Sequence, residues 1–158
     1  MKTLTLLLTM ALCLTSCATT QVMFTEEDQQ AFVFEDVSGT KDELYLKAQK
    51  WMTQVFNNAE SVIQHSDKEE GAIMGKYLMF GETKSGMYGT MVDSRVYATI
   101  DIRVKDNKAR IEVKPQGSWQ YDDSGMTVYS YSKQQAQTDI KNLADSFHKA
   151  LLSAGVEF

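Results

Sequence analysis

The chain has 158 residues, 43% of them hydrophobic and 10% aromatic, and a formal net charge of −5 at pH 7. This length and composition fit one globular domain with its own core and exclude an intrinsically disordered chain, which would carry fewer apolar residues. The acidic balance argues against a nucleic-acid-binding surface, which requires many basic side chains, and against electrostatic docking on anionic lipid.

The first segment, residues 1–17, has the pattern of a secretory signal. Lys2 precedes an apolar run at residues 4–14, which is shorter than the roughly 20 residues that a membrane-spanning helix needs. The Leu-Thr-Ser-Cys sequence at 14–17 resembles the lipobox of bacterial lipoproteins. This resemblance implies cleavage before Cys17, a diacylglycerol on its sulfur and an acyl chain such as palmitate on its new amino group. We therefore expect an exported lipoprotein, anchored in a membrane of the bacterial cell envelope, with the outer membrane as its expected location.

If this prediction holds, neither cysteine of the chain remains as a free thiol in the folded domain. Cys13 leaves with residues 1–16, and Cys17 becomes the lipid attachment point. The mature chain of 142 residues has a formal charge of −6, because the signal contains Lys2 and no acidic residue. We expect no disulfide, no cysteine nucleophile and no thiolate metal site in the folded domain.

Residues 17–29, which follow the cleavage site, are polar and aperiodic. We expect them to form a flexible tether between the lipid and a single α+β domain over residues 30–158. The domain opens with a short strand, in which Phe32 and Phe34 alternate with other residues until Ser38 and Gly39 stop the run.

A helix is predicted next, over residues 41–58. Thr40 and Glu43 have the spacing of a capping box, which marks a helix start. Apolar residues then recur with the period of one helix face. This face contains Leu44, Ala48, Trp51, Met52, Val55 and Phe56.

The middle of the chain reads as consecutive strands. They are predicted at residues 61–66, 72–80, 95–104 and 109–114. Gly71 ends a charged turn and suits a positive φ angle, residues 81–93 form the longest flexible connection, and Pro115 ends or edges the last of these strands. Consecutive strands joined by short turns indicate an antiparallel sheet with one solvated face.

The last third contains one open prediction and one clear helix. Residues 118–131 are compatible with either a hairpin or an irregular excursion. Ser132 and Gln135 form a second capping box, and the helix that they start ends near Gly155. The apolar face of this helix consists of Ala136, Ile140, Leu143, Ala144, Phe147 and Leu151.

Residues 30–82 resemble an uncharacterised family of bacterial lipoproteins described as a domain of unknown function with a TATA-binding-protein-like (TBP-like) fold. Lys-Asp-Glu-Leu at 41–44, Trp51, and Ile-Gln-His-Ser-Asp-Lys-Glu-Glu-Gly-Ala-Ile-Met-Gly at 63–75 carry the resemblance. It implies a curved antiparallel sheet of about five or six strands with two helices on one face, in the order β-α-β-β-β-β-α. It brings no known catalytic residues. We expect no nucleic-acid partner, because a DNA saddle needs a basic open face.

One polar cluster invites a catalytic interpretation. His65, Ser66 and Asp67, followed by Glu69 and Glu70, place a base, a hydroxyl and carboxylates within six residues. Neighbours in a strand point to opposite faces, so they do not form a triad by themselves. The cluster is therefore predicted to be a strand end and a solvated turn, and we expect no metal and no cofactor.

Spaced aromatic residues form the best candidate for a binding surface. They are Tyr88, Trp119, Tyr121, Tyr129 and Tyr131. Such residues stack on sugars or anchor protein partners, but cross-strand aromatic pairs also stabilise sheets. Both interpretations stay open.

The leading functional hypothesis is a non-enzymatic binding or interaction module, anchored through Cys17, with an envelope protein or polymer as its partner. The sequence leaves two alternatives open. One is an exported hydrolase with an unrecognised carboxylate or His65 centre, and the other is a carrier that encloses an apolar ligand between its helices and its sheet.

Overall fold

A computed structural model of the chain describes six stretches separated by gaps: residues 21–56, 62–81, 83–85, 91–93, 95–120 and 131–153. Side chains at 21–22, 83–85, 91–93 and 118–120 lie outside the description. None of the helices within these stretches is both long enough and apolar enough to cross a bilayer.

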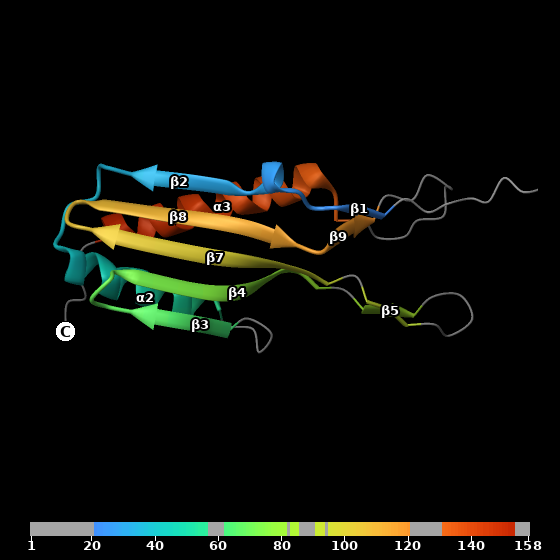
Figure 1. Ribbon diagram of the computed structural model, residues 1–158, viewed down its shortest axis with the longest axis horizontal. Helices are drawn as coiled ribbons and strands as arrows, with labels where there is room; N and C mark the ends of the chain where they lie inside the picture. Colours follow the sequence, from blue (N-terminus) through green and yellow to red (C-terminus); the bar gives the residue numbers. More distant parts are fainter. Residues whose placement is uncertain are drawn as a thin grey trace, which may run out of the picture.

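The body of the molecule is a five-stranded antiparallel sheet covered on one face by two helices (Figure 1). In spatial order the strands are β2 (Gln30–Phe34), β8 (Lys108–Gln116), β7 (Val96–Lys105), β4 (Ala72–Phe80) and β3 (Val62–Asp67). The helices are α2 (Lys41–Val55) and α3 (Lys133–Leu152). The predicted α+β class, with two helices on one face of an antiparallel sheet, is confirmed (Figure 1).

Strict alternation along β7 and β8 separates a buried face from an open one. Ile100 and Ile102 of β7 are fully buried beneath the helices, together with Ile111 of β8, which pairs with Ile102. The intervening side chains, such as Thr99 and Asp101, point to the open face. The period of two therefore decides which residues enter the core.

Helix α2 begins as predicted and ends three residues early. The Thr40 amide donates to Glu43 Oε2 at 2.8 Å, and the Glu43 amide donates to Thr40 Oγ1 at 3.3 Å, which completes the capping box. Phe56 leaves the helix and its ring packs beside Tyr77, with 5.6 Å between centroids. This packing requires Gly75, because a Cβ there would lie 2.4 Å from the Phe56 ring.

Helix α3 packs its predicted apolar face against the sheet and α2, and all six of its predicted face residues are buried. Its N-cap is Ser132, whose hydroxyl accepts from the Gln135 amide. It ends at Leu152, before Gly155. The Phe147 ring lies 5.1 Å from that of Trp51, which is 2% exposed. Trp51 is thus a core residue, as its place on the helix face predicts.

Two elements form between residues 21 and 28, within the segment that the sequence predicts as a flexible tether. Strand β1 (Gln21–Met23) pairs antiparallel with β9 (Ser118–Gln120), and a 3-10 turn, η2 (Glu26–Asp28), follows it. Asp28 is only 5% exposed, and its Oδ1 lies 2.7 Å from Lys133 Nζ at the start of α3. Strand β1 has only three residues, which are too few to show the alternation of a strand, and its partner β9 lies about a hundred residues further along the chain. The sequence alone therefore does not predict β1.

One further prediction needs correction. Part of the connection predicted as flexible forms a hairpin, in which β5 (Thr83–Ser85) pairs with β6 (Met91–Asp93). Strand β8 continues past Pro115, but β2 pairs with β8 only as far as Val113, so Pro115 lies where β8 has no β2 neighbour, in keeping with the predicted edge position. Within residues 118–131, for which the sequence left a hairpin or an irregular excursion open, β9 forms and pairs with β1.

Gly71 takes the positive φ expected at the turn between β3 and β4, with a value of 66°. A Cβ at this position would lie 2.5 Å from the carbonyl oxygen of Val104. The turn and its contact with β7 therefore both require glycine.

Candidate functional site

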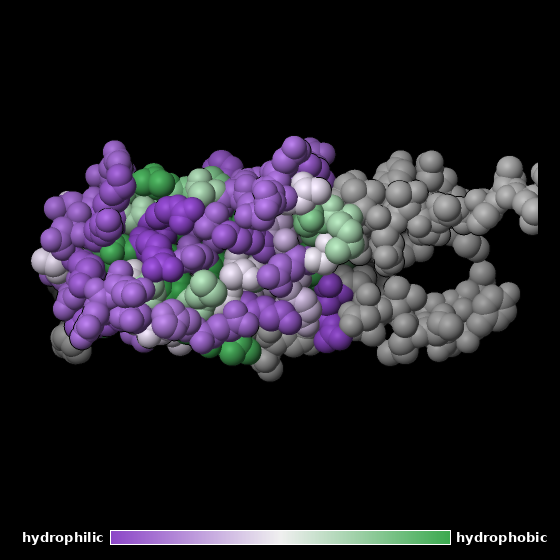
Figure 2. Space-filling model, in the orientation of Figure 1, coloured by the Kyte–Doolittle hydropathy of each residue, from purple (hydrophilic) through white to green (hydrophobic). Residues whose placement is uncertain are grey.

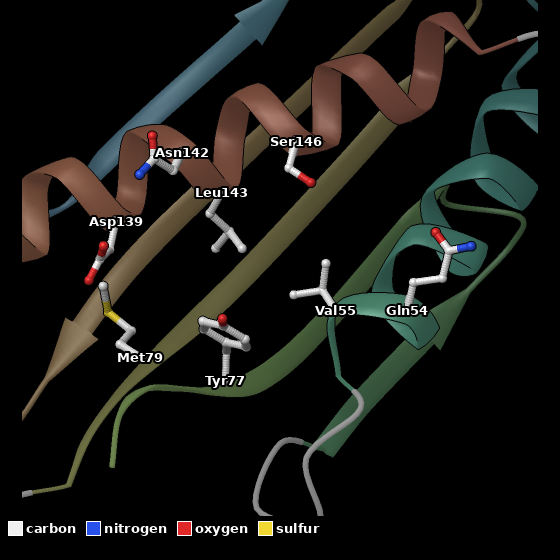
Figure 3. A pocket seen from close by; sticks show the side chains of 8 residues that line it. All are labelled: Gln54, Val55, Tyr77, Met79, Asp139, Asn142, Leu143 and Ser146. Carbon is white, nitrogen blue, oxygen red and sulfur yellow. The ribbon is translucent and has the colours of Figure 1, made fainter. Parts of the chain in front are cut away.

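A groove lies between the last turns of α2 and the middle of α3, with β4 as its floor (Figure 3). Its volume is about 470 Å³. The residues that line it are Gln54, Val55, Tyr77, Met79, Asp139, Asn142, Leu143 and Ser146. Polar and apolar groups contribute in similar proportion, a mixture typical of sites that bind a partly apolar ligand in a fixed orientation.

The groove follows from the lengths and positions of the elements. Helix α2 has 15 residues and α3 has 20, and α2 ends at Val55 where Phe56 turns onto the sheet. Tyr77 and Met79 occupy the helix face of β4 beside this end, and the register of β4 against β7 shifts just after Leu78. The early end of α2 thus leaves part of β4 uncovered and open to the side of α3.

A hydrogen bond from a buried tyrosine holds the side chain of Asp139 in place. Tyr131 Oη donates to Asp139 Oδ2 at 2.7 Å, and the Tyr131 ring stacks on Phe80 with 5.2 Å between centroids. Burial raises the pKa of Tyr131, and its bond to the Asp139 carboxylate raises it further. Tyr131 therefore remains a proton donor and fixes one oxygen of Asp139.

Tyr77 also stays neutral at physiological pH. Its partial burial raises its pKa, and the negative charge of Asp139 raises it further. None of the eight lining residues is basic. Asp139 is therefore the only charged group of the lining, and the groove disfavours anions.

Several polar groups of the lining are available to a ligand. Trp51 Nε1 donates to Ser146 Oγ at 3.1 Å, which fixes that hydroxyl at the edge of the groove. Within the described stretches, no hydrogen bond engages the Tyr77 hydroxyl or the side-chain amides of Gln54 and Asn142. These amides can both donate and accept.

The aromatic binding candidates are only partly placed. Tyr88, Tyr121 and Tyr129 lie outside the described residues, as does the lipidation candidate Cys17. Trp119 lies in β9, where its side chain is outside the description. Tyr131 is 2% exposed, so its ring serves core packing, which is the alternative left open for the aromatic group, and not surface recognition.

The His65 cluster is divided between the two faces of the sheet edge. Ser66 turns to the helix side and shares a hydrogen bond with the Tyr45 hydroxyl, whereas His65 pairs with Met74 on the open face. Asp67 Oδ1 accepts from the Glu70 amide at 3.0 Å, and this bond holds the pKa of Asp67 below its usual value. No group of three potential metal ligands occurs in the described part of the chain.

The two histidines lie far apart. His65 is on the edge strand β3, whereas His148 of α3 stacks on Phe34 of β2, the strand at the opposite edge, with 4.3 Å between ring centroids. His148 Nε2 lies 3.0 Å from Asp36 Oδ1. Neither histidine reaches the groove.

The side of the molecule in view is mainly hydrophilic, with small hydrophobic patches among the polar side chains (Figure 2). The central cations of the open sheet face share fewer carboxylates: Arg103 Nε lies 3.1 Å from Asp101, and Arg110 and Lys114 lie 3.0 and 3.2 Å from the same Glu112 side chain. Lys76 lies over the ring of Tyr97, with 3.7 Å between its Nζ and the ring centroid.

Sequence reasoning missed the groove, although one signal for it exists. Asp139, Asn142 and Ser146 recur at i, i+3 and i+7, so they form a polar line on one side of the apolar face of α3. The sequence does not show that α2 ends early enough to expose this line.

The sequence of residues 33–115 matches the family described as "Domain of unknown function (DUF4468) with TBP-like fold". Among solved structures, the chain is similar to a DUF4468 family protein from Bacteroides ovatus, with a TM-score of 0.50, 13% identity, and coverage of 86% of this chain and 94% of that one. A TBP-like protein from Parabacteroides distasonis has a TM-score of 0.49 and 15% identity, with coverage of 85% and 94%. These likenesses concern the fold alone. No curated protein matches the chain in sequence.

Proposed function

The chain belongs to the DUF4468 family, a domain of unknown function with a TBP-like fold, and we propose that it acts as a lipid-anchored, non-enzymatic binding module of the cell envelope. The anchor is Cys17, and the binding site is the groove between α2 and α3. The lipobox-like end of the signal supports the anchor. The groove supports the binding role, since it combines apolar walls with polar groups that have no partner in the described structure.

The observation that carries this proposal is the single carboxylate in a groove without a base. Asp139 is held in place by Tyr131, and Val55, Met79 and Leu143 supply apolar contact. The ligand that fits is an apolar stem that ends in an ammonium or guanidinium group, such as a lysine or arginine side chain of a partner protein. A charge-assisted hydrogen bond to Asp139 fixes the head, and the stem packs on the apolar wall.

The two alternatives have less support from the geometry. A hydrolase centred on His65 needs a nucleophile or water site beside it, but His65 lies on the open face of β3, away from the groove. A carrier of an apolar ligand needs a largely apolar enclosure, whereas about half of the groove lining is polar.

The anchor is tested by Cys17→Ser. The variant should move from the membrane fraction to the soluble fraction and stay folded, because the described domain begins only at residue 21. Retention of the folded variant on membranes at high salt would contradict the anchor.

The groove is tested by titrating the soluble Cys17→Ser protein with n-hexylammonium, n-hexanol and n-hexanoate and following backbone amide chemical shifts. We expect hexylammonium to shift residues of α2, α3 and β4 that surround the groove, and hexanoate to shift them least. Asp139→Asn keeps an oxygen to accept from Tyr131 but removes the charge, so it should weaken hexylammonium binding several-fold and leave hexanol unchanged.

Asp145→Asn is the matched control. Asp145 lies on the same helix, pairs with Lys141 on its exposed side and is absent from the groove lining, so the variant makes the same change in net charge. If both variants weakened hexylammonium binding equally, the effect would come from the overall charge of the protein and not from Asp139. Shifts that map away from the groove would contradict the site.

A further inference from the structure

We propose that the domain stands end-on at the membrane. The end that carries the β1–β9 ribbon and the β5–β6 hairpin lies at the lipid headgroups, and the β7–β8 turn points away from the bilayer. This inference rests on the Cys17 anchor of the proposed function.

The chain between the anchor and the fold is short. Only residues 18–20 separate Cys17 from Gln21, the first residue of β1. Four Cα steps span at most about 14 Å even when fully extended. Strand β1 is held in turn by its pairing with β9, so Gln21 stays close to the headgroups.

The anchor joins the molecule at one end of its long axis. Met23 pairs with Ser118, which only Gly117 separates from the end of β8, while Gln21 pairs with Gln120, two residues further from the main sheet. The Phe24 amide donates to the Gly117 carbonyl at 3.1 Å and fixes this junction. Figure 1 shows the β5 strand projecting from the same end as β1 and β9.

The opposite end is far from the anchor. The nine residues of β8 extend for roughly 30 Å, and they separate the ribbon from the β7–β8 turn at Asp106 and Asn107. The turn end therefore lies well beyond the reach of a 14 Å connection, unless the domain lies on its side.

Lying on its side would place one of the two long faces against lipid. The open face carries Asp101, Arg103, Arg110 and Glu112 as paired charges, and the mature chain has a net charge of −6. Moving such groups toward lipid costs solvation energy. Exposed apolar side chains do not decide between the two placements, because Met23 at the ribbon end is 59% exposed, and Val33 of β2 and Leu46 of α2 are 51% and 56% exposed. End-on placement keeps both long faces, and the groove, in water.

The absence of a free thiol in the predicted mature chain permits a direct measurement. Single cysteines are introduced by Met23→Cys at the ribbon end, Lys105→Cys at the turn end, Lys50→Cys on the helix layer and Thr99→Cys on the open face. Each lipidated protein is labelled with a donor dye. It is then added to phosphatidylcholine vesicles that contain a phosphatidylethanolamine with an acceptor on its headgroup.

We expect the loss of donor emission to be greatest at position 23 and smallest at position 105, with similar intermediate losses at 50 and 99. A flexible Gly/Ser insert of about twelve residues after residue 20 should reduce the difference between 23 and 105, because it releases the domain from the membrane surface.

Equal transfer at positions 23 and 105 would overturn the orientation, as would a larger difference between 50 and 99 than between 23 and 105. An unchanged difference after the insertion would show that the short connection does not set it. The intact mass separates this failure from that of the anchor. A protein that carries acyl chains yet shows equal transfer overturns the orientation alone, whereas a mature protein without them overturns the proposed anchor as well.

Discussion

The two faces of the central sheet are stabilised by different interactions. Under the helices, Ile100 and Ile102 of β7 are completely buried, and their stabilising contribution comes from apolar area removed from water. On the open face, Asp101 and Arg103 of the same strand pair with each other and remain partly solvated. Two residues that are adjacent in sequence therefore contribute to stability in different ways, one by apolar burial and the other by a partly solvated ion pair.

This difference also separates the fold from the proposed function. The TBP-like shape draws attention to the open face, because a saddle-shaped nucleic-acid binder works through that surface. Here Arg103 pairs with Asp101, Arg110 and Lys114 share Glu112, and Lys76 lies over the Tyr97 ring. The groups without partners lie instead on the helix side, in the groove where α2 ends early. A shared fold thus does not locate the site.

The comparison is tested most strongly by two adjacent substitutions in β7. Ile100→Ala should lower the free energy of unfolding by about 2–5 kcal/mol, because it leaves a cavity beneath the helices. Thr99→Ala should lower it by only about 0.5–1.5 kcal/mol, since it removes one exposed hydrogen bond from Gln116. Urea unfolding followed by circular dichroism measures both values.

Similar losses at the two positions would break the comparison, since they would show that the open face contributes as much packing as the helix face. A Thr99→Val variant serves as a control, because it keeps the shape of the side chain and removes only the hydroxyl.

A smaller effect is expected from Asp28, the only charged residue that is buried in the described part of the chain. Burial acts to raise the pKa of Asp28, but bonds from Lys133 and from the Thr25 amide outweigh it and hold the pKa below its usual value. The stabilisation is therefore complete above the unfolded pKa of about 3.9 and is lost as the pH falls through the lower folded value.

Asp28→Asn should lower stability at pH 7 by about 1 kcal/mol, allowing for solvent around the half-exposed Lys133. It should also flatten the decline of stability in acid below about pH 4. Unfolding midpoints of both proteins between pH 7 and pH 2 measure this. An equally steep acid decline in the variant would assign the decline to other carboxylates.

Long periodic segments were predictable because each carries its own signal. The capping box at Thr40, the face of α3 and the alternation of β7 all depend on residues close in sequence, and the structure confirms them. The order of elements then restricted the fold to an antiparallel sheet under two helices.

The short elements were not predictable in the same way. Strand β1 exists because β9 lies beside it, and Asp28 is buried because Lys133 reaches it. Three residues cannot show a period, and no local rule connects positions a hundred residues apart. The flexible tether predicted up to residue 29 is wrong from residue 21 onward for this reason.

The sequence by itself determined the class of the fold, the buried faces of both helices and the expectation of an anchor at Cys17, because each depends on a local pattern of apolar residues, caps or processing signals. The tertiary structure alone decided that Tyr131 is a core residue that supports Asp139, and that the end of α2 at Val55 opens a groove beside it. Both outcomes depend on packing between segments that are distant in the chain, so the site became visible only when those segments met.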